Sequence, residues 1–428
     1  KEVEPVEPES RARFLGAWQH ITTTRGGPRG VDGVLTVVDQ LAGCAVPASA
    51  LESLVLPSRV RDYEPAFLDE LTSSGEVLWA GHAALPGSDG WVSLHLADQA
   101  PLTLPEHEPF EHSELHQAVL DALAPGGAWF FRQLSQAVGS TNDVSLSAAL
   151  WDLVWAGRVG NDTLAPLRAL TRSGTTTHRS RRPPPRTRAA GRMPARTGPA
   201  ETAGRWALLP AIDADPTRRG HAAAEHLLDR HGVVIRGAVV SERLPGGFAA
   251  AYKVLSAFED SGRCRRGYFV AGLGAAQFGS AGAIDRLRTF AEVDPDAKPT
   301  AVALAATDPA NPYGAALPWP ERVVAEGGER SGHRPGRKAG ALVVLVDGHL
   351  TLYVERGGRT LLTWADDPAL LAPAAESLAT AARRGSLGKL TVEKADGEQL
   401  LGAGLTPLRA ALQDAGFLST PKGLRLRA

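Results

Sequence analysis

Hydrophobic and polar positions alternate most clearly in residues 215–270. Apolar side chains recur there at the spacing of one helical face, which predicts a first helix. They are Ala223, Ala224, Leu227 and Leu228. The run 233–235 predicts a short strand, because it is too short and too β-branched to extend the helix. Helices are predicted at 238–242 and 248–260, and a hairpin at 262–270. Helix, strand, helix, helix, hairpin is the element order of a winged helix.

Two similar series of predicted elements lie upstream. The first has three helices and then two strands of alternating apolar and polar residues, which we interpret as a wing. These elements span residues 31–41, 47–54, 64–73, 76–80 and 91–96. The second has three helices and a later strand that completes its wing. These elements span residues 112–123, 130–138, 144–156 and 205–209.

An internal repeat supports this division. The segments LDELTSSGEV (68–77), LWDLVWAGRV (150–159) and LSAFEDSGRC (255–264) share two apolar residues three positions apart, a glycine four later and an apolar residue two after that. The glycine lies where the third helix must end in a left-handed cap before the first wing strand. A generic helix C-cap is the alternative, and any single copy fits it. Three copies in matching order favour repeated small domains.

The last third of the chain predicts two more modules. Short β runs separated by Asp-Gly and Gly-Gly indicate hairpins in a small barrel or curled sheet. These runs span residues 341–346, 349–354 and 360–364. Two helices and two strands then predict a final winged-helix-like module. They span residues 370–382, 389–393, 406–415 and 423–427.

These patterns predict an α+β fold of tandem winged-helix modules with a small β-barrel, resembling winged-helix DNA glycosylases. The expected domains are an N-terminal helix with winged helix 1 (1–110), winged helix 2 (111–214), winged helix 3 (215–300), a polar loop with the barrel (301–366) and the C-terminal module (367–428). An Arg- and Pro-rich insertion, 171–204, has almost no large apolar group and is expected to be disordered. It is either a solvated insertion or a loop that touches nucleic-acid phosphates.

Composition narrows the chemistry. The net charge is −1, so nucleic-acid binding requires a local basic face. With only Cys44 and Cys264 and no Cys/His cluster of zinc-ligand spacing, no metal site is predicted and a reducing cytosol is expected. No apolar run approaches the roughly 20 residues that a membrane span needs. The Gly-x-x-x-x-Gly-Lys-Ser/Thr loop that cradles ATP phosphates is absent, so no cofactor is predicted for this segment.

Five basic residues of the third winged helix are the best candidates for DNA phosphate contacts. They are Arg243, Lys253, Arg263, Arg265 and Arg266. A winged helix presents its third helix and wing to the duplex, and arginine donates two parallel hydrogen bonds to phosphate. The alternative is a solvated wing on a module whose groove-facing side is used for packing.

The loop LAATDPANPYGAALPW (304–319) is polar and aromatic in a chain with few aromatic residues. Next to a small barrel, such a loop can hold a flipped base. Tyr313 or Trp319 would stack on that base, and Asp308 or Gln277 would position a water molecule for catalysis. The alternative is a structural loop whose prolines and aromatic side chains cover the open end of the barrel.

Two stretches resemble a known family. GRCRRGYFVAGLGAAQFGS (262–280) and LAATDPANPYGAALPWP (304–320) resemble the C-terminal region of the large helicase-related (Lhr) proteins of bacteria, with an actinobacterial source expected. Lhr proteins are long ATP-driven superfamily 2 DNA helicases. The resemblance implies a DNA repair helicase whose motor, with its ATP and Mg²⁺, lies elsewhere. A chain that begins at Lys1 and holds one methionine fits a piece of a longer polypeptide.

Two hypotheses about function follow. The first is a noncatalytic region of an Lhr-type helicase that binds single-stranded or duplex DNA and assembles subunits. The second is a DNA glycosylase that acts on uracil or alkylated bases, since tandem winged helices ending in a barrel also resemble the bacterial winged-helix glycosylases. Those enzymes carry a Gln-x-Gln motif that is absent here, and only Gln277 is suggestive.

Self-association is expected from the tryptophans of the first two modules. These modules have no cluster of basic residues, so the tryptophans do not belong to a predicted DNA-binding surface. They are Trp79, Trp91, Trp129, Trp151 and Trp155. Trp151 and Trp155 share a helix face, whereas the wing residues Trp79 and Trp91 are harder to bury within one module. Apolar patches of this kind predict a homo-oligomer, a dimer or tetramer. The expected location is cytoplasmic and nucleoid-associated, with no membrane.

Overall fold

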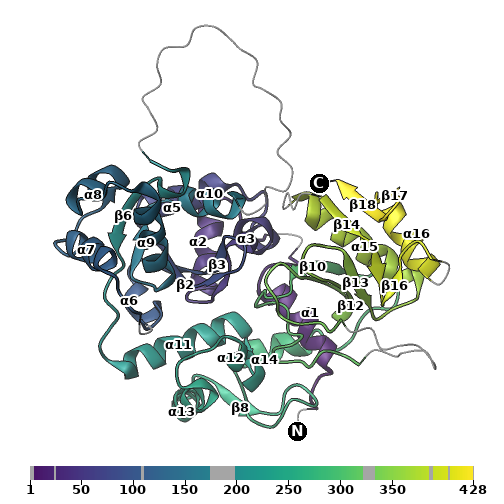
Figure 1. Cartoon of the computed structure of the whole chain (residues 1–428). Helices are drawn as coiled ribbons and strands as arrows, with labels where there is room; N and C mark the ends of the chain where they lie inside the picture. The colour runs from purple at the N-terminus through teal and green to yellow at the C-terminus, as the bar shows by residue number, and fades with distance from the viewer. Residues whose placement is uncertain are drawn as a thin grey trace. The chain divides into compact units, whose positions relative to one another are not determined.

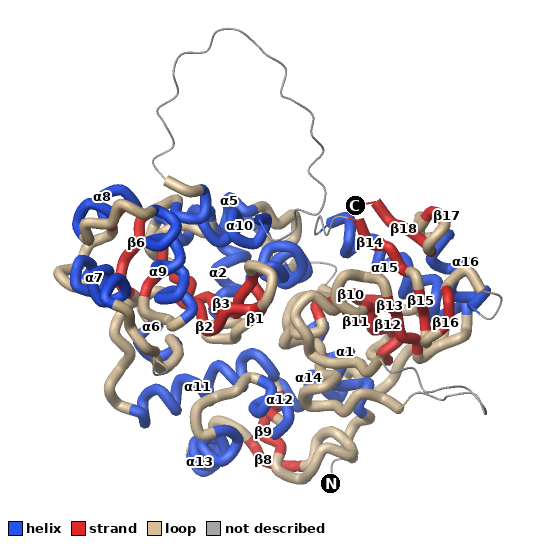
Figure 2. Tube along the Cα trace, viewed as in Figure 1, coloured by secondary structure: helices blue, strands red, loops and turns tan. Residues whose placement is uncertain are grey.

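The computed structural model describes residues 4–23, 26–107, 110–173, 198–321, 333–384, 389–402 and 405–427. Figures 1 and 2 show its helices and strands. Contacts along the chain divide it into two compact units. The first unit joins Lys1–Leu41, Ala50–Tyr63 and Asp215–Ala428, and the second joins Ala42–Ser49 and Glu64–Ala214.

The winged helix predicted at residues 215–270 is present in the first unit. Its first helix begins where the Asp215 side chain accepts a hydrogen bond from the Thr217 backbone N–H (2.8 Å), and it ends at Gly232 with φ 64°. The elements are α11 (Pro216–His231), β7 (Val233–Val234), α12 (Arg236–Ser241), α13 (Gly247–Asp260), β8 (Arg265–Gly267) and β9 (Gln277–Gly279). The sheet order is β7-β9-β8, which confirms the predicted fold.

A second winged helix lies in the second unit, and an insertion interrupts its wing. Its elements are α7 (Glu114–Leu123), β4 (Trp129–Phe130), α8 (Phe131–Ala137), α9 (Asp143–Trp155), β5 (Val159–Asn161) and β6 (Arg205–Leu208). The sheet order is β4-β6-β5, so the strand predicted at 205–209 does complete the wing.

The insertion is partly ordered, contrary to expectation. Its first three residues belong to the end of α10 (Ala165–Ser173), and a 3₁₀ turn lies at Ala200–Thr202. Residues 171–173 therefore belong to a helix. The remainder of the predicted disordered segment, 174–197, lies outside the described residues.

The first winged helix contains α2 (Gly30–Gln40), β1 (Val46–Pro47), α3 (Ala48–Ala50), the π-helical turn η1 (Leu51–Val55), α4 (Leu56–Arg59), α5 (Pro65–Ser73), β2 (Val77–Leu85) and β3 (Asp89–Leu96). Its sheet order is β1-β3-β2. The helix predicted at 47–54 is thus a composite of two short α-helices around a π-helical turn. The two units divide this module, because α2 and α4 belong to the first unit and β1, α5, β2 and β3 to the second.

The N-terminal helix α1 (Pro8–Trp18) belongs to the first unit and packs with the third winged helix. Val6 forms a bridge with Val270, and the buried side chains of Phe14 and Leu15 join the core that contains Ile284 of α14 (Ala281–Arg288). The apolar face of α1 is therefore buried by residues more than two hundred positions away in the sequence.

The strand-rich region forms an open sheet of six strands, in the order β10-β11-β12-β13-β15-β16. These are β10 (Ala301–Ala305), β11 (Leu342–Val346), β12 (His349–Val354), β13 (Thr360–Thr363), β15 (Lys394–Ala395) and β16 (Glu398–Gln399). Asp347 and Gly348 connect β11 and β12 with φ 48° and 85°, as predicted for an Asp-Gly hairpin. Within the described residues the expected barrel is not closed.

Other elements cover both faces of the sheet. Helix α15 (Pro368–Arg384) packs on β10, β11 and β12. The core cluster of the opposite face holds Val343 and Leu345 together with Ala12 of α1 and the loop residues Tyr313 and Leu317. All five residues of β11 are buried, as is typical of a strand covered on both faces.

The C-terminal module contains α15, β14 (Lys389–Val392), α16 (Thr406–Asp414), β17 (Leu418–Thr420) and β18 (Gly423–Arg427). Its sheet order is β14-β18-β17, so the last strand, predicted at 423–427, is present and lies in the centre of the sheet. A search of the described helices finds none with the length and apolarity to cross a membrane.

Candidate nucleic-acid interface

The third helix of the third winged helix, α13, turns one narrow face to solvent. This face consists of Ala249, Ala250, Lys253 and Ala257, all exposed. The opposite side buries Leu255 and Phe258 in the module core. The third helix of a winged helix enters the major groove, and small side chains let its backbone approach the base edges. Of these residues only Lys253 was predicted, although the helical spacing of the alanines was available as a signal.

Three of the five predicted basic residues have side chains exposed to solvent. Arg243 follows α12 in a left-handed conformation with φ 54°, Lys253 lies on α13, and Arg265 opens β8. Among the residues that the structure describes, Lys253 and Arg265 form no salt bridge. Their charges are therefore available to a phosphate backbone.

The other two predicted basic residues are held by neighbouring acids. Arg263 forms an ion pair with Glu225 and lies over the Phe258 ring, with its Cζ 4.1 Å from the ring centroid. The Arg266 Nε lies 3.3 Å from Glu259 Oε2. Both arginine side chains remain more than 40% exposed, so these pairs are weak and can exchange for phosphate.

The β8–β9 loop is docked and does not project like a free wing. The Gln277 side chain is fully buried and holds this loop. Its Oε1 accepts from the backbone N–H groups of Phe269 (2.9 Å) and Val270 (2.8 Å). Its Nε2 donates to the carbonyls of Val270 (2.8 Å) and Gly274 (2.9 Å). All hydrogen-bonding positions of the amide group are occupied, so Gln277 stabilises the loop and offers no group to a catalytic water.

Asp308, the predicted catalytic acid, lies in a buried ion pair in the first unit. Its Oδ1 accepts from Arg59 Nη2 (2.6 Å) and from the Ala310 N–H (2.8 Å), and its Oδ2 accepts from Arg59 Nη1 (3.0 Å). Arg59 also donates to Gln19 Oε1 (2.6 Å). Both carboxylate oxygens are engaged and the side chain is about 1% exposed, which is the environment of a structural ion pair.

Tyr313 and Trp319, the predicted base-stacking residues, pack onto the six-stranded sheet. Tyr313 is 4% exposed, its hydroxyl donates to the Gly348 carbonyl (2.7 Å), and burial raises the pKa of this hydroxyl. Trp319 meets Tyr353 edge-on at 5.8 Å between ring centroids. This geometry supports the alternative in which the loop covers the sheet.

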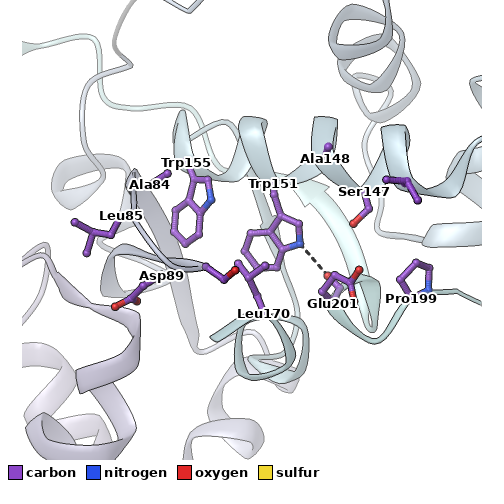
Figure 3. Close-up of a pocket in the computed structure, with 12 residues that line it drawn as sticks. Ala84, Leu85, Asp89, Ser147, Ala148, Trp151, Trp155, Leu170, Pro199 and Glu201 are labelled. Carbon is purple, nitrogen blue, oxygen red and sulfur yellow. Dashed lines mark hydrogen bonds between the residues drawn. The ribbon is translucent and has the colours of Figure 1, made fainter. Parts of the chain in front are cut away.

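The third helix of the second winged helix, α9, is covered. It packs on β2, which belongs to the wing of the first winged helix. Trp151 is 6% exposed and donates from its indole N–H to the Glu201 carbonyl (3.0 Å; Figure 3). Trp79 of the wing is 1% exposed and lies 6.4 Å from Trp151 between ring centroids. The second winged helix of the same chain therefore covers Trp79, which is not exposed for an interface between subunits.

Comparison with protein families matches residues 6–97 and 213–299 to two models, each described as large helicase-related protein, winged-helix domain. This chain contains two Lhr winged-helix domains. The matched ranges coincide with the first and third winged helices, and the earlier resemblance to the C-terminal region of Lhr is confirmed.

Two curated relatives share this similarity. A Mycolicibacterium smegmatis protein named Lhr helicase/probable uracil glycosylase is 50% identical over the whole of this chain, and the Escherichia coli Lhr helicase/uracil glycosylase is 42% identical over 94% of it. The chain spans only 28% and 27% of the length of these two relatives. Kinship with Lhr supports a DNA-binding role for the winged helices.

A solved structure shares the fold. Streptomyces sahachiroi DNA glycosylase AlkZ superposes with a TM-score of 0.53, covering 91% of this chain and all of AlkZ, at 14% sequence identity. At this identity the likeness concerns the arrangement of winged helices and not the chemistry.

Proposed function

We propose that this Lhr region binds DNA chiefly through the third winged helix, as part of an ATP-dependent DNA repair helicase. The observation that carries the proposal is the exposed face of α13, where three alanines surround Lys253. Arg243 and Arg265 are exposed on the same module, and Arg263 and Arg266 form weak, exposed ion pairs with Glu225 and Glu259. Both duplex and single-stranded DNA present the phosphates that these cations would neutralise.

The test is the salt dependence of DNA binding by the whole chain. Replacing Lys253 and Arg265 together with alanine should lower the slope of log affinity against log salt by about two units, one for each lost phosphate contact. A matched control replaces Arg356 and Arg359, two exposed arginines after β12, and should leave the slope unchanged. Equal slopes for both double variants would contradict the proposal.

A second candidate function is removal of uracil from DNA. The names of both relatives include uracil glycosylase, and AlkZ shares the fold. Incubation with a labelled uracil-containing oligonucleotide, followed by alkali, should produce a strand break at the uracil. If this chain produces no break while a reference glycosylase run in parallel cuts the same oligonucleotide, this candidate function is ruled out.

Self-association into a dimer or tetramer is part of the same proposal. Trp79 is buried within its own unit, so other side chains must supply the interface. Phe130 and Val144 of the second winged helix are 55% and 78% exposed and are the better candidates. Light scattering should show a species larger than 45 kDa that shrinks with Phe130→Glu. A 45 kDa species at micromolar concentration would contradict self-association.

A further inference from the structure

Tyr268 follows strand β8 in the third winged helix and presents an aromatic ring to solvent. Its side chain is 42% exposed. Of the phenylalanine, tyrosine and tryptophan side chains in the described ranges, only Phe130 of the second winged helix is also exposed. Phe248 and Phe278 meet the ring of Tyr252 edge-on in and against the module core, and Tyr268 is not part of that cluster.

Hydrogen bonds fix the Tyr268 ring and the backbone beside it. The hydroxyl oxygen accepts from the Gly272 N–H (2.6 Å), which holds the ring at the start of the loop. The next residue, Phe269, donates its N–H to the buried Gln277 side chain (2.9 Å) and accepts from the Val6 N–H (2.8 Å). A ring that is already ordered loses little conformational entropy when a ligand stacks on it.

The segment around Tyr268 is basic. Residues 261–280, which contain β8, the following loop and β9, hold three arginines and no aspartate or glutamate. Arg265 is exposed and lies three residues before Tyr268, which is at most about 11 Å of extended chain. A nucleic-acid strand whose phosphate pairs with Arg265 therefore brings its neighbouring bases within reach of the Tyr268 ring.

An unpaired base is the ligand that suits this position. Each base inside a duplex is stacked on its neighbours, so a protein ring reaches the face of a base only where the strand is unpaired or the helix ends. Proteins that bind single strands combine cations that follow the backbone with aromatic rings on which the bases stack. Arg265 and Tyr268 supply one of each.

We propose that Tyr268 stacks on an unpaired base of the DNA whose phosphates contact the third winged helix. This inference rests on the proposed DNA contact and adds a substrate class to it, namely DNA with a single-stranded segment. Every base has a face on which an aromatic ring can stack, so this contact recognises the unpaired state and not the sequence.

Binding of the whole chain to two DNA probes tests the proposal. One probe is a single-stranded oligothymidine, which forms no base pairs with itself, and the other is a blunt duplex. Tyr268→Ala should weaken binding of the oligothymidine by about tenfold, the contribution of one stacked base. Binding of the duplex should change by less than about twofold, and the salt slope should stay the same because no charge is removed.

Matched variants separate the ring from its hydroxyl and from its size. Tyr268→Phe keeps the ring and loses the hydrogen bond from Gly272, and it should bind the oligothymidine within about twofold of the unaltered chain. Tyr268→Leu keeps an apolar side chain without an aromatic face, and it should behave like Tyr268→Ala. Leu418→Ala shortens a 66% exposed side chain of the C-terminal module and should change neither affinity. Thermal unfolding of each variant verifies that the fold is retained.

Three results would overturn the proposal. They are an equal loss of affinity for both probes in Tyr268→Ala, full affinity for the oligothymidine in Tyr268→Leu, and a loss in Tyr268→Phe as large as that in Tyr268→Ala. The salt slope distinguishes this failure from failure of the DNA contact itself. If the Lys253 and Arg265 double variant loses slope while the Tyr268 variants bind normally, the phosphate contact stands and the stacking does not.

Discussion

Helices α9 and α13 hold the same position in two winged helices, but α9 also packs on β2, a wing strand of another module. Helix α9 buries Leu146, Leu150 and Leu153 on one side and Trp151 on another. Helix α13 buries one side and leaves three alanines and Lys253 exposed. The winged-helix pattern determines the fold of each module, but the packing of the rest of the same chain decides which faces of its third helix stay exposed to solvent.

Glycine explains how α9 comes to be covered. Trp155 lies against Gly81 and Gly90 of the wing strands β2 and β3, where any Cβ would collide with the indole ring. The absence of side chains at these two positions leaves space for the Trp155 ring to pack on the strands. Among the described residues, no pair of glycines packs against α13 in this way. The exposed alanines of α13 are also too small to fill such a space.

The largest effect is expected from removal of Trp151. Trp151→Ala should lower the free energy of unfolding of the second unit by about 3–5 kcal/mol, because it removes a buried aromatic side chain and one hydrogen bond. Tryptophan fluorescence during urea unfolding measures the loss. Val144→Ala, on the 78% exposed start of the same helix, should cost less than about 0.5 kcal/mol. A similar small loss for Trp151→Ala would mean that α9 is not covered in solution.

A pH effect of intermediate size is expected from the wing that covers α9. His82 Nε2 lies 2.6 Å from Ser93 Oγ, which lies 2.7 Å from His95 Nε2. Burial lowers the pKa of His82 to about 4. The unfolded chain, with a histidine pKa of about 6.5, takes up this proton first, so stability should fall by about 2–3 kcal/mol from pH 6.5 to pH 4. His82→Gln should flatten this part of the pH profile of unfolding, and an unaltered profile would exclude His82 as its cause.

A smaller loss of stability is expected when a side chain is added at Gly90, which packs against Trp155. Gly90→Ala places a methyl group against the Trp155 ring and should destabilise the second unit by about 1–3 kcal/mol. Gly282→Ala in α14 is the control, since nothing lies within 4 Å of its Cβ position, and helix propensity should make it neutral or slightly stabilising. Urea unfolding of both variants measures the difference. Equal stabilities would show that Trp155 moves away from the wing.

The smallest change in stability, with a clear change in binding, is expected at the exposed face of α13. Ala249→Glu should alter the free energy of unfolding by less than about 1 kcal/mol, in the favourable direction, because an acid near a helix N-terminus is stabilising. DNA affinity should fall, because the added charge faces the phosphates. Ala249→Gln separates the effect of charge from that of size. Unchanged affinity in Ala249→Glu would place the DNA contact elsewhere.

The sequence alone determined the local elements. The order of helices and strands in the third winged helix, the glycine caps at Gly75, Gly157 and Gly262, and the Asp-Gly hairpin after β11 all depend on residues a few positions apart. Apolar spacing and backbone preference act over this range, so they can be read from the chain.

Only the tertiary structure decided what those elements bury. Asp308 and Arg59 are 249 positions apart, and their pairing turns a predicted catalytic acid into a structural one. The open sheet, the placement of α1 and the cover over α9 likewise depend on partners that are distant in sequence. A local pattern shows that a side chain seeks burial or a charge seeks a partner, but which partner it meets is set by the packing of the whole unit.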